Sequence, residues 1–419
     1  MQHINKASKI NKWFTAIVIL FPILNIYSAG MSTLGLGDVF GLIIIVSLLI
    51  SNRWRIRNTE KNYGHFVWYF VLISFILTIV ISEYSLTQFA LKGLRFIVYT
   101  ILIIWFGRDR FDVDFGFNLY IRISTIAAIY LIIQYVLKTF FSVTLPITIP
   151  YLKLLYTDST GAAYNEQLLQ MYSLFGYRAP GFFKEPSHFC QYVALSVVLL
   201  LFKSANSIKR NVSIALIIAA IIISTSAIGY ISLVATIILW YIYTFNSRKA
   251  INNVLSLVVG SIAIVFLSIK SGAFSSAVSR INTINYTHAA TGNLRLLRGF
   301  YVYQQMPLVF KIFGIGFGNY SAFVDTYGIQ TFFDDLVDKH SEYMSAISCV
   351  VVNSGLIGLG LYISGLIEIF RKTTLVQKVL FVNFLILIIS TSSFFSATYV
   401  MYMVFLVANM SSNSESESV

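Results

Sequence analysis

The chain has 419 residues, of which 57% are hydrophobic and only 11% are charged. A soluble domain averages about 25% charged residues, so this composition excludes a soluble protein with a large aqueous catalytic domain. The net charge of +13 is not evidence for a nucleic-acid partner, because positive charge in a membrane protein reports first on the orientation of its loops.

Long apolar runs predict an all-α polytopic membrane protein with about twelve spans in one integral membrane domain, residues 1–419. Helices are expected rather than barrel strands because the runs are continuous and do not alternate. In chain order the expected spans are residues 13–30, 37–51, 64–82, 89–106, 117–137, 188–203, 212–224, 227–245, 251–269, 342–369, 379–392 and 398–411. Residues 411–419, rich in Ser and Glu, are interpreted as a disordered tail.

The placement of Lys and Arg predicts the orientation of these spans. With the N-terminus inside, the inner segments hold most of the short-loop cations, including those of residues 53–61. No Lys or Arg occurs in the opposite short loops, which lie near residues 31–36, 83–88, 225–226 and 393–397. Because positive residues in short loops stay on the cytoplasmic side, both termini are expected in the cytoplasm.

Two long outer loops, residues 138–187 and 270–341, carry most of the remaining positive charge. Connections of this length are uncommon unless they are functional or disordered, and their Tyr, Phe and Leu content disfavours disorder. We therefore expect the two loops to form an ordered cap over the outer face of the protein.

The first outer loop ends in RAPGFFKEPS, residues 178–187, and runs directly into the sixth span. Pro186 suits the first turn of a helix, where backbone N–H groups remain available. A helix N-terminus flanked by Arg178 and Lys184 favours an anion, so a phosphate is expected to bind here.

The second outer loop contains Arg295 and Arg298 in a stretch expected to form a helical turn. Their spacing of three places both guanidinium groups on one face, where they can grip phosphate oxygens as a fork; contact with lipid headgroups is the alternative. Arg280 lies in the same loop. Arg95 and Lys92, at the outer end of the fourth span, are charged groups of the kind that usually face a cavity.

Glycines at positions 314, 316 and 318 allow the backbone to turn tightly or to approach a ligand closely. His340 and Tyr343, three residues apart, are expected to face the same way at the membrane surface. The outer loops contain no carboxylate cluster with metal-ligand spacing, so we expect no metal.

Three motifs occur in a fixed order along the chain: R-x-P-G-F-F-x-E-P-S at 178–187, G-x-x-R followed by P-x-x-x-x-x-x-G-x-G-x-G-x-Y at 292–320, and H-S-E-Y followed by N-S-G-L-I-G at 340–358. In these motifs the chain resembles the Wzy-type polysaccharide repeat-unit polymerases, which are similar to the O-antigen ligases. The resemblance implies a GT-C-like glycosyltransferase of the bacterial inner membrane that needs no cofactor.

The resemblance also implies the reaction. A growing glycan is transferred from undecaprenyl diphosphate to the non-reducing end of another lipid-linked repeat unit, at the outer face of the membrane. The implied partners are the lipid-linked oligosaccharide, the bilayer and a chain-length regulator protein, without nucleic acid.

The same family pattern implies roles for individual residues. Arg178 and Arg295 match its arginines and are expected to clamp the diphosphate, with Arg298 and Arg280 as further contacts. His340 is interpreted either as a diphosphate contact or as the acid/base group.

The role of Glu185 stays open between a general base and a carboxylate that pairs with Arg178 and holds it in place. Tyr343 and Asn353 are expected to support the groups that contact substrate.

Two alternatives remain. An O-antigen ligase uses the same donor, but ligases more often have Pro-Asn after the acidic residue, where this chain has Pro186 and Ser187. A lipid-linked sugar flippase or another transporter tends to place broken helices and polar groups at mid-bilayer. This chain concentrates its polar residues in the outer loops.

Overall fold

The computed structural model describes residues 9–30, 34–50, 60–155, 160–167, 177–204, 206–244, 291–335, 337–392 and 394–409. The expected span 251–269, Arg280 and the tail 411–419 lie outside the described residues. The named regular elements of the described part are all helices, which confirms the all-α prediction.

The longer described helices are α1 (Lys9–Leu24), α2 (Leu36–Ile50), α3 (Lys61–Val80), α4 (Leu86–Thr100), α6 (Val113–Phe141), α8 (Pro186–Phe202), α9 (Ile208–Ile223), α10 (Ala227–Thr244), α13 (Thr291–Gln305), α16 (Ala346–Arg371), α17 (Leu375–Ser390) and α18 (Ala397–Val407). The shorter ones are α5 (Arg108–Arg110), α14 (Leu308–Phe313) and α15 (Tyr320–Thr326), and a π-helical segment, Ile101–Gly107, joins α4 to α5.

Five helical segments among the described residues are long and apolar enough to cross a membrane: α3, the run Leu86–Arg110 that contains α4, α6, α10 and α16. A helix is suited to this environment because it satisfies its own backbone hydrogen bonds. The shorter apolar helices α2, α8, α17 and α18 accompany them.

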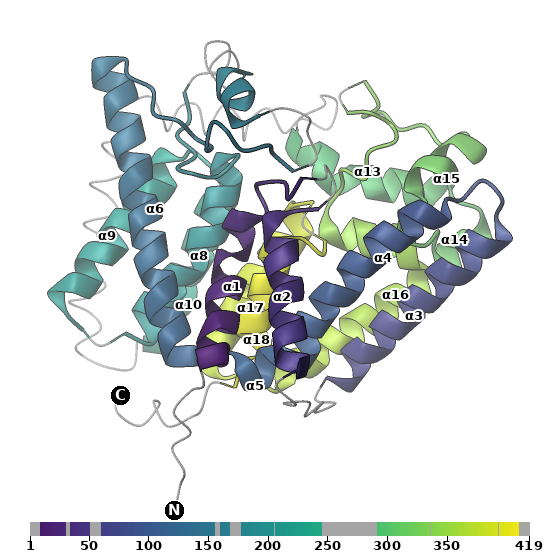
Figure 1. The fold of residues 1–419 in the computed structure, drawn as a ribbon, viewed down its shortest axis with the longest axis horizontal. Coiled ribbons are helices and arrows are strands. Elements are labelled where there is room, and N and C mark those ends of the chain that lie inside the picture. Colours follow the sequence, from purple (N-terminus) through teal and green to yellow (C-terminus); the bar gives the residue numbers. More distant parts are fainter. Residues whose placement is uncertain are drawn as a thin grey trace, which may run out of the picture.

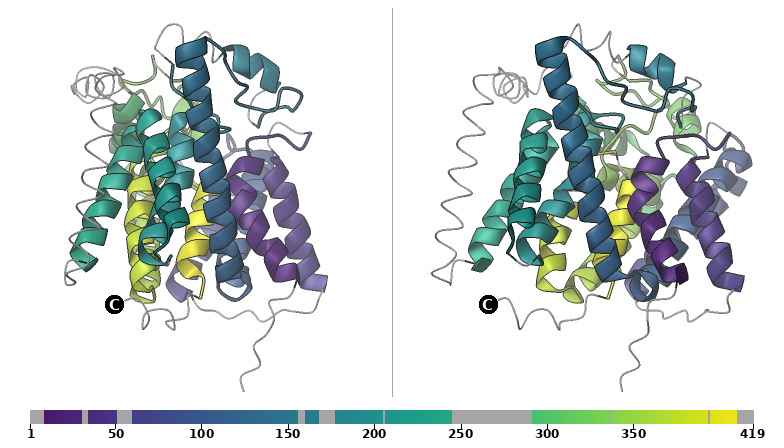
Figure 2. Two further views of the ribbon diagram at one scale, coloured as in Figure 1. Left: turned by 90° about the vertical axis from the view of Figure 1, so that its left-hand side faces the viewer. Right: turned by 60° about the vertical axis from the view of Figure 1, so that its left-hand side comes forward.

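The long helices run roughly side by side (Figures 1 and 2). On one side of the bundle lie α6, α8, α9 and α10, and on the other lie α2, α3, α4 and α16, with α1, α17 and α18 between them. The helices α13, α14 and α15 lie at one end of the bundle, which we call the loop end.

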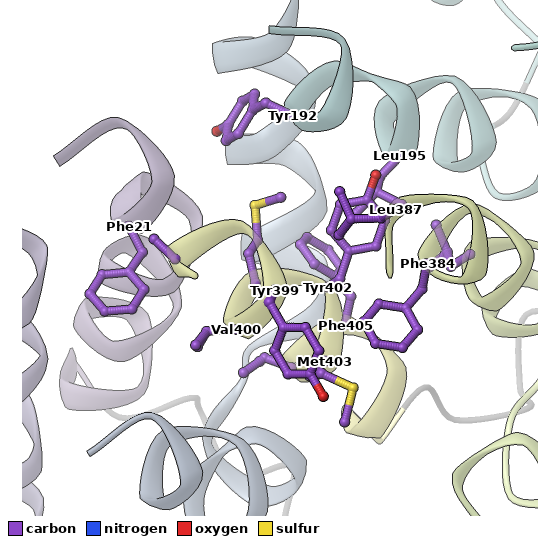
Figure 3. Close-up of a cluster of buried hydrophobic side chains, with 14 of the residues drawn as sticks. Phe21, Tyr192, Leu195, Phe384, Leu387, Tyr399, Val400, Tyr402, Met403 and Phe405 are labelled. Carbon is purple, nitrogen blue, oxygen red and sulfur yellow. The ribbon is translucent and has the colours of Figure 1, made fainter. Parts of the chain in front are cut away.

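The centre of the bundle is α18, which is apolar on all sides and buried almost throughout. Its side chains Tyr399, Met403 and Phe405 are surrounded by residues of neighbouring helices, including Phe21 of α1 and Phe384 of α17 (Figure 3). A helix that is apolar on all sides is suited to a position buried among other helices.

The start of α1 and the end of α18 lie at the same end of the bundle, opposite the loop end (Figure 1). Beyond α18, the Asn409 amide donates a 3.4 Å hydrogen bond to the Arg108 carbonyl in α5, which lies at the same end.

The described part of the first outer loop is tied to the bundle. The Leu155 amide donates to the Ile26 carbonyl at 3.0 Å, and the Ser28 amide donates to the Lys153 carbonyl at 2.9 Å. These backbone contacts hold the loop against the end of α1, so this segment is ordered by pairing with a helix terminus.

A break within α16 distinguishes it from the uninterrupted span expected at 342–369. Gly355 has φ 64° and ψ −169°, a conformation essentially reserved for glycine. The loop after α14 fills the break, since the Ile315 and Gly316 amides donate to the carbonyls of Val352 and Asn353 at 3.1 and 2.9 Å.

Glycine is required on both sides of this junction. A Cβ on Gly314 would lie 2.3 Å from the Asn353 carbonyl oxygen, and one on Gly355 would lie 2.3 Å from the Ile312 carbonyl oxygen. At position 314, the close backbone approach that glycine permits is therefore an approach to α16, whereas at position 316 it is an approach to Ser74 of α3.

Candidate functional site

The segment 178–187 delivers Glu185 to the start of α8, as the sequence predicts. Pro186 is the first helical residue, and Glu185 precedes it in extended conformation. The Ser187 hydroxyl donates to the Glu185 carboxylate at 3.0 Å, and the Glu185 side chain remains 47% exposed. The carboxylate is therefore positioned locally but is still accessible.

Arg295 reaches this carboxylate from α13. Its Nη2 lies 3.7 Å from Glu185 Oε2, and its Nε donates to the Tyr343 hydroxyl at 2.6 Å. The Arg295 carbonyl accepts from the Ser345 amide at 2.6 Å, which fixes α13 to the start of α16. Arg295 is thus held on two sides while its side chain stays 19% exposed.

Glu185 is surrounded by more positive than negative charge. Burial by itself raises the pKa of Glu185, but the electrostatic influence of His188, Arg295 and Arg178 and the hydrogen bond from Ser187 outweigh it and lower the pKa. Burial also lowers the pKa of His188, so Arg295 and Arg178 are the permanent positive charges beside the carboxylate. The group is therefore held as a carboxylate.

His188 was not among the residues expected at this site, although it follows Glu185 by three positions in the first turn of α8. Helical spacing from the acidic residue is the signal that could have found it.

Arg178 is fixed to the turn between α9 and α10. Its Nε donates to the Thr225 hydroxyl at 2.7 Å, and its Nη2 donates to the Thr225 carbonyl at 2.8 Å. Arg295 forms an ion pair with Glu185 at 3.7 Å, and the charge of Arg178 also acts on this carboxylate and lowers its pKa.

Lys184 completes this group of residues. Its Nζ donates to the Leu155 carbonyl at 2.9 Å, and burial lowers its pKa, an effect that the charge of Glu185 only partly offsets. We call the set Glu185, Arg295, Tyr343, Arg178, Lys184 and His188 the α8 corner.

Arg298 does not form a fork with Arg295. Its side chain is fully buried, and its guanidinium group donates to the carbonyls of Asp338, Lys339 and Ser341 at distances of 2.9 to 3.1 Å. Arg295 and Arg298 are three residues apart, so their side chains leave α13 on the same face. The segment 338–341, however, covers only Arg298. Arg298 therefore organises this loop.

His340 lies on the surface and outside the α8 corner. Its Nδ1 is 2.9 Å from Asp338 and its Nε2 is 3.0 Å from Asp325, and these hydrogen bonds raise its pKa. The shared helical face expected for His340 and Tyr343 does not exist, because α16 begins only at Ala346.

A cavity of about 460 Å³ lies beside α4. Arg95 and Asn353, the last two of the residues that the sequence predicts at a substrate site, are among the residues that line it. Two ion pairs line it as well: Arg95 with Asp38 at 3.0 Å, and Lys92 with Glu342 at 3.0 Å. We call this space the α4 cavity. Glu342 and Tyr343 are consecutive, so one short segment contributes to both the α4 cavity and the α8 corner.

The described residues contain no group of three His, Cys, Asp or Glu side chains placed to hold a metal ion. No family model matches this chain, and no curated protein matches it in sequence. The α8 corner and the α4 cavity are the two places in the described residues where the predicted site residues gather.

Proposed function

We propose that this protein is a lipid-dependent glycosyltransferase, a polymerase that acts on oligosaccharide units carried by undecaprenyl diphosphate. The proposal includes about twelve spans with a GT-C-like arrangement, both termini in the cytoplasm, and a site at the outer face of the bacterial inner membrane. The observation that carries it is the α8 corner, where an accessible carboxylate and an excess of cations lie at the loop end of an apolar bundle.

The chemistry of transfer suits this corner. An acceptor hydroxyl oxygen forms a bond to the anomeric carbon of the donor, the bond from that carbon to the diphosphate oxygen breaks, and the diphosphate leaves with the electron pair. Arg295 and Arg178 supply fixed positive charge where that negative charge develops. The hydroxyl proton passes to water or to the departing diphosphate.

The environment of Glu185 favours a positioning role over the role of general base. A carboxylate whose pKa is lowered binds a proton less readily than an ordinary Glu, which makes it a poorer general base. Its contact with Arg295 instead favours a positioning role, in which Glu185 orients the guanidinium group toward the leaving diphosphate.

The test is Arg295→Lys in purified protein in nanodiscs, supplied with lipid-linked repeat units from the host. Lysine keeps the charge but loses the planar donor array, so transfer is expected to fall about 100-fold with unchanged folding. Lys311→Arg, an exchange at an outer basic residue away from the α8 corner, is the control. Wild-type rates in Arg295→Lys would contradict the proposal.

Deletion of the gene in its native host separates polymerase from ligase. A single repeat unit on the surface anchor is expected for a polymerase. Polymer that is made but not attached would indicate a ligase.

The break in α16 favours a transporter as the second candidate, because transporters use discontinuous helices at their substrate sites. Here the protein's own loop occupies the break and satisfies the carbonyls of Val352 and Asn353. Translocation of labelled lipid-linked sugar in proteoliposomes, without glycan elongation, would establish the transporter instead.

A further inference from the structure

We infer that the α4 cavity is a carbohydrate subsite that receives the neutral non-reducing end of the acceptor glycan. The inference rests on the proposed function and adds a second location to it: the diphosphate belongs at the α8 corner, and the acceptor sugar belongs in the α4 cavity.

The size and position of the cavity suit a small ligand. Its volume of about 460 Å³ lies within the range of about 300–1,000 Å³ typical of such sites. Residues of α2, α3, α4 and α16 line it, and its walls are completed by Phe317, Ser392, Phe394 and Phe395.

The charges of the cavity cancel. Its charged lining residues are Asp38, Lys92, Arg95 and Glu342, and they form two ion pairs of 3.0 Å each. A diphosphate entering this space would meet no excess of positive charge, in contrast to the α8 corner. A neutral polar ligand needs no excess of positive charge and can therefore bind there without an electrostatic penalty.

Two hydrogen-bond acceptors beside those ion pairs remain available to a ligand. Asn353 is buried, and its Oδ1 has no hydrogen-bond partner among the described residues. Glu342 Oε1 is likewise without a partner there, although Oε2 of the same carboxylate accepts from Lys92. Buried polar atoms are costly to leave unsatisfied, and amide and carboxylate groups are suited to sugar hydroxyls.

Aromatic surface provides the other half of sugar recognition. The cavity is lined by Phe70, Phe96, Phe317, Phe394 and Phe395. The C–H face of a pyranose ring packs on such rings, while its hydroxyls turn to the polar wall. The headgroup of a diacyl lipid could contact the charged side chains of the ion pairs. It has no ring face to pack on the phenylalanines, so it would not account for the aromatic wall.

The experiment uses the full chain in nanodiscs with a fixed concentration of lipid-linked donor. The acceptor probe is the delipidated repeat-unit oligosaccharide of the host. Asn353→Leu removes the amide at similar volume, and Ser392→Trp fills the cavity from an exposed position that tolerates a large side chain. Asn383→Leu is the control for loss of a buried amide outside the cavity lining: Asn383 is also buried, its Oδ1 has no partner among the described residues, and its Nδ2 donates to Thr236 and Val379.

The expected result is a rise in acceptor KM of at least about tenfold in Asn353→Leu and Ser392→Trp, with donor binding unchanged and the control like wild type. An unchanged acceptor KM in folded Ser392→Trp, with wild-type polymerisation intact, would overturn the subsite and leave the proposed function standing. If native mass spectrometry then showed a phospholipid displaced by Ser392→Trp, the cavity would be a lipid site.

The proposed function can also fail separately. If wild-type protein makes no polymer but binds the oligosaccharide, and Asn353→Leu abolishes that binding, the carbohydrate site is supported and the polymerase assignment is not.

Discussion

The start of α8 and the break in α16 each contain a motif that pointed to ligand contact, and the structure gives the two motifs opposite environments. At the break, Gly314 and Gly355 are in close contact with backbone, and the carbonyls there accept hydrogen bonds from the protein itself. At the start of α8, Glu185 and Arg295 keep accessible charge. Glycine motifs can thus be satisfied internally, whereas the charged groups at the start of α8 remain accessible.

The largest effect is expected from Gly355→Ala. The substitution forces a side chain into a backbone conformation essentially limited to glycine and places Cβ 2.3 Å from the Ile312 carbonyl oxygen. We expect a loss of more than about 3 kcal/mol in the free energy of unfolding, seen as loss of folded protein in detergent extracts.

Gly360→Ala is the control on the same helix. No heavy atom lies within 4 Å of the Cβ that it would add, so stability should be unchanged or slightly higher. Equal stability of Gly355→Ala and Gly360→Ala would show that the break in α16 does not need glycine for close packing.

Arg298→Lys should have the next largest effect. Lysine keeps a buried charge but cannot reach the three carbonyls that Arg298 satisfies, so we expect a loss of about 2–4 kcal/mol in unfolding free energy. Arg295→Lys, at a partly exposed position, should change stability by less than about 1 kcal/mol. Thermal unfolding of Arg298→Lys and Arg295→Lys, measured side by side, tests whether Arg298 stabilises the fold while Arg295 does not.

Glu185→Gln tests the functional side of the comparison. Gln keeps an oxygen beside Arg295 that is able to accept a hydrogen bond but loses the charge of the ion pair, so we expect transfer to fall about tenfold, with weaker donor binding, rather than to stop. Single-turnover rates and donor binding in nanodiscs measure both quantities. Complete loss of turnover with normal donor binding would identify Glu185 as the general base.

The pH dependence of Glu185 has a definite sign. Its folded-state pKa is lowered, so its stabilising contribution is present above the ordinary value of 4.5 and is lost as pH falls through the lowered value. Near neutral pH, neither its charge nor its contact with Arg295 should change.

The smallest effect is expected at His340, whose pKa is raised by Asp325 and Asp338. The stabilisation from these contacts is complete below the ordinary value of 6.5 and is lost as pH rises through the raised pKa. Asp325→Asn should lower the pKa of His340 in an NMR titration, whereas Asp335→Asn should not. Equal pKa values in both variants would show that the contact does not persist in solution.

The local features of the sequence were the most predictable. Pro186 at the first position of α8 was correctly predicted, because proline has a fixed φ and lacks the N–H that this position does not need. The all-α character was also correct. The roles assigned to individual residues were less predictable, since Arg298 is buried and His340 is held by surface carboxylates.

His188 and Glu342 were overlooked for different reasons. His188 is close to Glu185 along α8, so helical spacing was sufficient to find it. Glu342 meets Lys92, 250 positions away, and nothing in either local sequence indicates that pairing.

The sequence by itself determined that the protein is built of apolar helices, because each apolar run satisfies its own backbone hydrogen bonds as a helix. It also determined where α8 begins. The tertiary structure alone decided which cations meet which carboxylates. That choice depends on how residues 338–345 cross α13: this crossing buries Arg298 under three carbonyls and leaves Arg295 between Tyr343 and Glu185. Side-chain spacing specifies a direction from the helix, but only the packed neighbours specify what lies there.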